Sequence, residues 1–141
     1  MKKIILLLTI LIILFSCEIE SNKIYEIAGY VISVNSDETL TFYGLAKKWE
    51  KTVFYIPDSI VGHSVTKLAY DDSSNYDTTW DGCTKIYIPS TVNSIENRTF
   101  YNHSNSLSSI YWDRQYVYSA SFVPSGVILY VKNQYGNYIS W

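Results

Sequence analysis

The stretch "TKIYIPSTVNSI", residues 84–95, decides the fold because its pattern occurs more than once in the chain. A tyrosine stands between two isoleucines, and a proline follows. A related phrase, "VFYIPDSI", occupies residues 53–60, and shorter strand-like copies occur as "SIYWD" at 109–113 and "VILYVK" at 127–132. Internal repetition of this kind is typical of proteins built from stacked coils of chain.

The four copies share a core of apolar residue, tyrosine, apolar residue. Side chains alternate between the two faces of a strand, so the apolar residues point to one face and the tyrosines to the other. We therefore expect the apolar residues to build the core of a parallel sheet. The opposite face is expected to carry a row of four stacked tyrosines, which we call the tyrosine row: Tyr55, Tyr87, Tyr111 and Tyr130.

The second copy continues as "KIYIPSTVNSIENRTFYNHSNSLSSI", residues 85–110, and this phrase resembles the BspA-like (Treponema-type) leucine-rich repeats. In the first copy Trp80 and Cys83 stand where that family has phenylalanine and cysteine, and in the second His103 replaces the cysteine. The resemblance covers residues 53–141. The family's core positions in the second copy are filled by Ile86, Ile88, Pro89, Val92, Ile95, Phe100 and Leu107.

These patterns predict a mainly β protein with short irregular or helical turns. The expected fold is a short leucine-rich-repeat solenoid with a parallel sheet, preceded by an N-terminal β-hairpin. The hairpin, residues 24–46, is predicted from the β-type runs "IYEIAGYVISV" and "TLTFYGL". Repeat coils occupy 53–131 and a C-terminal cap 132–141, all within one domain, 24–141. The resemblance implies that Tyr138 and Trp141 cover the core there.

The first sixteen residues read as a secretory signal, with two lysines, an apolar run at 4–15 and a small residue before Cys17. This run is shorter than the roughly 20 residues that a spanning helix needs. The sequence "LFSC" at 14–17 resembles a bacterial lipobox, which implies a lipid on Cys17, a spacer to residue 23 and a membrane anchor of acyl chains. The implied location is the cell envelope, at the outer membrane or cell surface. The alternative is an ordinary cleaved signal with Cys17 as a spare thiol.

The charge balance limits the partners. The chain has 11 Lys and Arg against 13 Asp and Glu, a net charge of −2, and removal of a signal carrying Lys2 and Lys3 would make it more acidic. Nucleic acid is therefore not an expected partner. With Cys17 acylated, Cys83 would be the last thiol, so we expect no intrachain disulfide.

We expect no enzymatic activity and no cofactor, since the sequence has no GxSxG, HExxH, P-loop or dinucleotide fingerprint. A thiol dyad of Cys83 and His103 is a weaker interpretation than two buried core residues in successive coils. The insertion at 69–79 spaces its oxygens like a calcium loop, but Tyr76 and Gly82 stand where such a loop needs glycine and glutamate. We predict no metal site there. The spaced oxygens belong to Asp71, Ser73, Asn75 and Asp77.

The tyrosine row is the candidate ligand surface. As structure, each cross-strand pair would contribute about 0.2–1 kcal/mol. As function, a rigid row of amphipathic rings suits protein partners and sugars. The leading hypothesis is a non-enzymatic envelope lipoprotein that binds protein or glycan, with adhesion as the role that the resemblance implies. The alternative is a periplasm-facing structural or assembly component. A small hydrolase would require Cys83 or His63 to be reachable beside a cleft.

Overall fold

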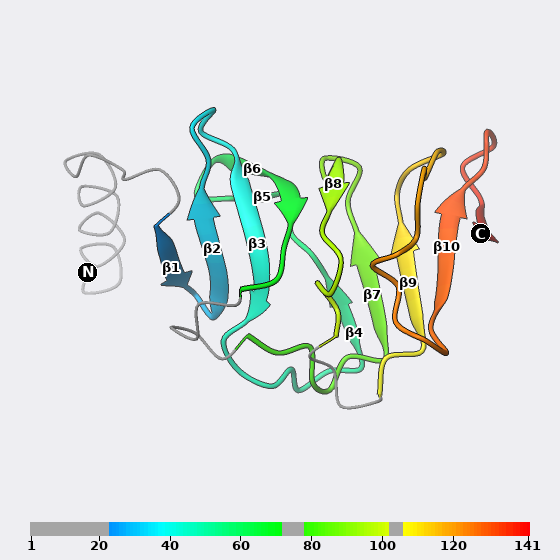
Figure 1. Ribbon diagram of the computed structural model, residues 1–141, viewed down its shortest axis with the longest axis horizontal. Coiled ribbons are helices and arrows are strands. Elements are labelled where there is room, and N and C mark those ends of the chain that lie inside the picture. The colour runs from blue at the N-terminus through cyan, green and yellow to red at the C-terminus, as the bar shows by residue number, and fades with distance from the viewer. Residues whose placement is uncertain (1–22, 72–77, 102–105) are drawn as a thin grey trace, which may run out of the picture.

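The computed structural model describes residues 23–71, 78–101 and 106–141. Within them lie eleven strands and no helix, so of the irregular or helical turns that were expected, those in this part of the chain are irregular (Figure 1). The strands are β1 Ile24–Ile27, β2 Tyr30–Val34, β3 Leu40–Leu45, β4 Val53–Tyr55, β5 Ser59–Ile60, β6 His63–Leu68, β7 Lys85–Ile88, β8 Ser94–Ile95, β9 Ser109–Trp112, β10 Ile128–Lys132 and β11 Tyr138–Ser140.

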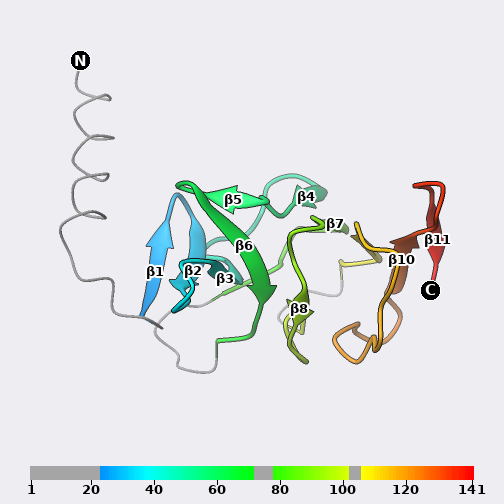
Figure 2. The ribbon, with the colours of Figure 1, turned by 90° about the horizontal axis from the view of Figure 1, so that it is seen from above.

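The strands form two sheets, and both sheets are mixed. One has the order β1-β2-β3-β6-β5, with β8 also pairing with β6 in parallel. The other has the order β11-β10-β9-β7-β4. Seen from above, β4 and β7 lie on one side of the molecule and β8 on the other, so between β4 and β9 the chain passes from one sheet to the other and back (Figure 2).

The predicted parallel sheet is present in part. Strands β4, β7, β9 and β10 pair in parallel, and their register aligns all four residues of the tyrosine row. The sheet then ends in β11, which pairs antiparallel with β10. The register confirms the alignment of the four sequence copies, whereas the antiparallel last strand was not expected.

The N-terminal segment is a three-stranded meander and not a single hairpin. The run at residues 24–34 is two strands, because Ala28 and Gly29 both adopt positive φ, 54° and 84°, and reverse the chain between β1 and β2. Strand β3 pairs antiparallel with β2 on one side and parallel with β6 on the other. The meander is thus continuous with the sheet that contains the first repeat copy.

The first copy contains a hairpin of its own. Val61 and Gly62 have φ of 51° and 84°, the left-handed pair that a two-residue turn between antiparallel strands requires, and they join β5 to β6. The ring nitrogen Nδ1 of His63 lies 2.7 Å from the backbone oxygen of Glu38, which ties this hairpin to the turn between β2 and β3.

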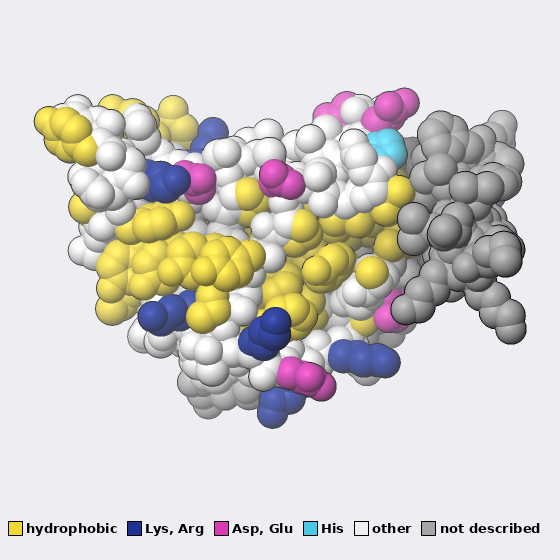
Figure 3. All heavy atoms as spheres, turned by 180° about the vertical axis from the view of Figure 1, so that it is seen from behind, with side chains coloured by type: hydrophobic (Ala, Val, Ile, Leu, Met, Phe, Trp, Pro, Cys, Tyr) yellow, Lys and Arg dark blue, Asp and Glu magenta, His cyan; other side chains and the backbone are white. Residues whose placement is uncertain are grey.

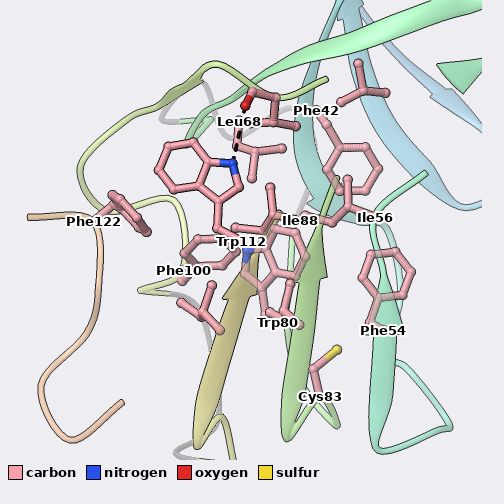
Figure 4. Close-up of a cluster of buried hydrophobic side chains, with 14 of the residues drawn as sticks. Phe42, Phe54, Ile56, Leu68, Trp80, Cys83, Ile88, Phe100, Trp112 and Phe122 are labelled. Atoms are coloured by element: carbon pink, nitrogen blue, oxygen red, sulfur yellow. Dashed lines mark hydrogen bonds between the residues drawn. The ribbon is translucent and has the colours of Figure 1, made fainter. Parts of the chain in front are cut away.

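The core lies between the two sheets and contains a chain of touching aromatic rings (Figure 4). Phe42 and Phe54 stack at 6.3 Å, and both contact Trp80. The two buried indoles have their hydrogen bonds satisfied: Trp80 Nε1 donates to the oxygen of Thr99 at 2.7 Å, and Trp112 Nε1 to the oxygen of Val92 at 3.3 Å. Five of the seven predicted core residues are buried, namely Ile86, Ile88, Val92, Phe100 and Leu107, whereas Pro89 and Ile95 are half-buried.

The end of the core near β10 is closed by the loop at 113–127. Its Phe122 is buried and packs against Phe100 and Trp112, at ring-centroid distances of 6.2 and 5.6 Å. The expectation that Tyr138 and Trp141 cover the core is wrong, because they are 36% and 59% exposed. Tyr138 pairs with Lys132 across the strands, and this register places it on the face that carries the tyrosine row.

Candidate functional site: the tyrosine row

The tyrosine row is a continuous stack of parallel rings. Tyr55 and Tyr87 have centroids 4.7 Å apart with 17° between their planes. Tyr87 and Tyr111 are 4.5 Å apart at 10°, and Tyr111 and Tyr130 are 4.7 Å apart at 8°. These spacings match the separation of neighbouring strands, so the backbone register sets the stack. On the side of the molecule opposite to Figure 1, hydrophobic side chains, tyrosine included, form a broad band (Figure 3).

Stacking decides which parts of the rings a ligand can reach. Each inner ring has both faces against a neighbour, so Tyr87 and Tyr111 present their edges and hydroxyl groups. Tyr55 differs, since it stands on the last strand of the sheet and is 66% exposed. Partial burial raises the pKa of the Tyr87 phenol, and the neighbouring phenols Tyr111 and Tyr55 raise it further.

Tyr138 is a fifth ring at this site, and the sequence analysis did not place it there. It meets Tyr111 edge-on at 5.2 Å and 81°, and Tyr87 at 6.1 Å and 73°. The ammonium of Lys132 lies 5.5 Å from the centre of the Tyr138 ring and forms an ion pair with Asp113. The pairing of β11 with β10 places Tyr138 on the same face as Tyr130. That antiparallel pairing is not evident from the sequence, so the position of Tyr138 could not be predicted.

A groove of about 350 Å³ adjoins the exposed end of the row, lined by Tyr30, Trp49, Lys51 and residues 52–55. Trp49 is fixed in place because its Nε1 donates to the oxygen of Val53 at 3.0 Å and its ring packs edge-on against Phe54 at 4.8 Å. A second groove, of about 330 Å³, shares Tyr30, Trp49 and Lys51 and adds Lys47 and Lys48. The sequence patterns predicted neither groove.

The comparison with solved structures bears on this arrangement. A leucine-rich cell surface protein from Faecalibacterium prausnitzii, known from a crystal structure, is similar over 77% of this chain, with a TM-score of 0.50 and 24% sequence identity. The fold is leucine-rich-repeat-like. The match covers 26% of that protein, so this chain spans about a quarter of its length. No family model and no curated protein matches the sequence.

Cys83, the residue considered above as part of a thiol dyad, is buried in this fold. Cys83 is fully buried, and burial, followed by the negative charge of Asp81, raises the pKa of its thiol to about 11. Its suggested partner His103 lies outside the described residues, as do most of the calcium-like oxygens. His63 is half-buried and held by Glu38.

Two further expectations concern the remaining chain. The signal at 1–16 and Cys17 lie outside the described residues. Across the part of the chain that is described, there is no helix of the length and hydrophobicity needed to cross a bilayer. The same residues contain no group of three or more His, Cys, Asp or Glu side chains close enough to hold a metal ion.

Proposed function

We propose that this protein is a non-enzymatic lipoprotein of the bacterial cell envelope, and that its short leucine-rich-repeat solenoid binds a protein or glycan partner through the tyrosine row. One observation carries the proposal. Four stacked tyrosines, with Tyr138 edge-on beside them, occupy the face of the sheet that the core does not use. Amphipathic rings on a rigid sheet lose little conformational entropy when they bind, which is why Tyr is common at interface centres.

The stacking also indicates how a partner is contacted. The inner tyrosines, Tyr87 and Tyr111, offer their hydroxyl groups and ring edges. The hydroxyl groups donate and accept hydrogen bonds, and the ring edges contact apolar groups. Ring faces, the surface on which a sugar stacks, are available only at the end of the row, at Tyr55. Tyr87 and Tyr111 therefore suit contact with a protein or with the hydroxyl groups of a glycan.

The proposed location in the cell envelope rests on the N-terminal sequence and on the solved structure of similar fold. A lipidated Cys17 would tether the domain, with each buried methylene of the acyl chains contributing about 0.8 kcal/mol. The solved protein of similar fold is described as a cell surface protein, which supports an exposed position for this one. Adhesion to a host or to a neighbouring cell is the role that we propose for such a surface.

The binding proposal is tested with the double substitution Tyr87→Thr and Tyr111→Thr in the full chain. We expect binding to whole cells, or to the best ligand from protein and glycan arrays, to fall at least about tenfold while the variant stays folded. Tyr116→Thr with Tyr118→Thr is the matched control, because these rings are 81% and 101% exposed but lie in the loop at 113–127. Unchanged binding with lowered stability would make the row purely structural.

The anchor is tested separately with Cys17→Ser. The parent protein should fractionate with membranes and incorporate a labelled fatty acid, and the variant should do neither. A variant that still fractionates with membranes and takes up the label as the parent does would refute the anchor.

A second candidate, an assembly component that packs against another envelope subunit, is favoured by the edge strand β11. Ile139 pairs with Val131, and the N–H of Trp141, just beyond β11, donates to the oxygen of Leu129, so both continue the core face of β10, yet they are 48% and 59% exposed. Added protease distinguishes the two candidates in intact cells. Cleavage of the domain supports surface binding, and protection until the outer membrane is opened supports the periplasmic role.

A further inference from the structure

We infer that the groove beside Tyr55 is the primary ligand subsite and that it takes an acidic sugar ring, a pyranose carrying a carboxylate. This rests on the proposed binding function and narrows it to one end of the row and one chemical class. Three features of the β4 edge carry the inference: an open aromatic face, a short stretch of free backbone groups and a set of unpaired lysines.

The open aromatic face belongs to Tyr55. Its ring stacks on Tyr87 on one side, and no further strand follows β4 in the sheet, so the other side of the ring is open. The exposed fraction of 66% agrees with this geometry. The C–H face of a pyranose packs on such a ring, whereas the flat stack of Tyr87 and Tyr111 has no free face to offer.

The backbone at this edge suits a compact ligand better than an added strand, because β4 is only three residues long. The N–H of Ile56 donates to the oxygen of Tyr87, so by alternation the backbone groups of Val53 and Tyr55 point away from the sheet. The oxygen of Val53 already accepts from the indole of Trp49. The N–H of Val53 and the N–H and C=O of Tyr55 remain for a ligand, which is enough for sugar hydroxyl groups, and the three-residue strand β4 offers little length to a peptide that pairs along the edge.

The charge at the groove favours a carboxylate. Lys51 lines it, and Lys47 and Lys48 line the adjoining groove on the other side of Trp49, with Glu50 as the one acidic residue of that segment. Among the described residues, none of these lysines is in an ion pair. Three unpaired ammonium groups within five residues of a chain with net charge −2 form a local site for an anion.

The opposite end of the row lacks these features and serves as the internal control. Tyr130 stacks on Tyr111, but β11 continues the sheet beyond it, with Ser140 in register with Tyr130. Tyr130 is accordingly half-buried. The one lysine close to that end, Lys132, is already paired with Asp113. The two ends of one stack therefore differ in access, backbone and charge.

The test is calorimetric titration of the full chain in detergent with trigalacturonic acid, and with galactotriose as the neutral counterpart. We expect trigalacturonic acid to bind and galactotriose to bind at least about tenfold more weakly. Tyr55→Ser and Lys51→Gln should each weaken binding of the acid by about tenfold or more, while Tyr130→Ser leaves it within about twofold. Binding of the acid should also weaken as salt is raised.

Several results would overturn the inference. Equal binding of both sugars removes the role of the lysines, and an equal loss in Tyr55→Ser and Tyr130→Ser removes the preference for one end. Equal binding of a hexaglutamate peptide would show a general anion site. Lys51→Gln replaces an exposed rim residue, so it tests the site even if Tyr55→Ser unfolds the protein.

The outcomes separate the subsite from the wider function. If trigalacturonic acid does not bind but the Tyr87→Thr, Tyr111→Thr variant still loses its partner, the inference fails and the proposed function stands. If the acid binds and the double variant keeps its partner on cells, the tyrosine row is not the partner surface and the subsite stands.

Discussion

Strand β7 places two different surfaces on neighbouring residues. Ile86 and Ile88 point inward and are 0% and 1% exposed, while Tyr87 between them points outward and joins the tyrosine row. The inward residues pack against the aromatic core and hold the two sheets together. The ring contacts of the outward residue, Tyr87, are all with other tyrosines. The difference shows that the core uses one face of the sheet, and it leaves the other face as the surface that we propose for a partner.

Replacing Trp80 tests the inward surface most severely. Trp80→Ala removes a fully buried ring that contacts Phe42, Phe54 and Phe100, and it leaves the oxygen of Thr99 without its donor. We expect a loss of about 3–5 kcal/mol in the free energy of unfolding, which urea denaturation measures. A loss below about 1 kcal/mol would mean that the core does not depend on this aromatic chain.

Thiol chemistry tests how completely the inward surface is closed. Burial raises the pKa of Cys83 to about 11, against 9.0 for the free thiol. At pH 8 this lowers the thiolate fraction about a hundredfold, and burial blocks access as well. Iodoacetamide should therefore modify Cys83 at least about a hundred times faster in denaturant than in the native protein, as peptide mapping reads out. Comparable rates in both states would refute a closed core.

A double-mutant cycle tests the outward surface. Tyr87→Thr and Tyr111→Thr, singly and together, should give a coupling of about 0.2–1 kcal/mol in the free energy of unfolding. The single changes should each cost far less than Trp80→Ala. A coupling above about 2 kcal/mol would make the row part of the structural framework and would erase the contrast between the two faces.

Alkaline pH gives the smallest expected effect. Because the folded state raises the pKa of Tyr87 above 10.0, it favours the neutral phenol. This contribution is complete below about pH 10 and is lost as the pH rises through the folded pKa. Tyr87→Phe keeps the stacked ring without the ionisable group, so its stability should fall less between about pH 10 and 12 than that of the parent. Parallel curves for both proteins would show that Tyr87 does not titrate differently in the fold.

The repeat pattern predicted much of the sheet, because a period of two along a strand is a local property. Phe54, Ile86, Ile110 and Leu129 are buried, and the row stacks on the opposite face as expected. The proline after two of the strands marked their ends.

The remainder depended on features that a local pattern does not record. The break at Ala28 depends on a positive φ at a residue other than glycine. Phe122 closes the core from a loop without periodicity, and Tyr138 reaches the row through an antiparallel pairing at the end of the sheet. Trp49 and Lys51 line a groove only because the chain folds back beside β4.

The most direct test compares Ile86→Ala with Tyr87→Thr, two adjacent residues of one strand, for both stability and partner binding. We expect Ile86→Ala to cost about 2–5 kcal/mol in unfolding free energy while the folded fraction binds normally. Tyr87→Thr should keep most of the stability and lose binding. A Tyr87→Thr variant that binds like the parent, or an Ile86→Ala variant whose folded fraction no longer binds, would contradict the division between a structural and a functional face.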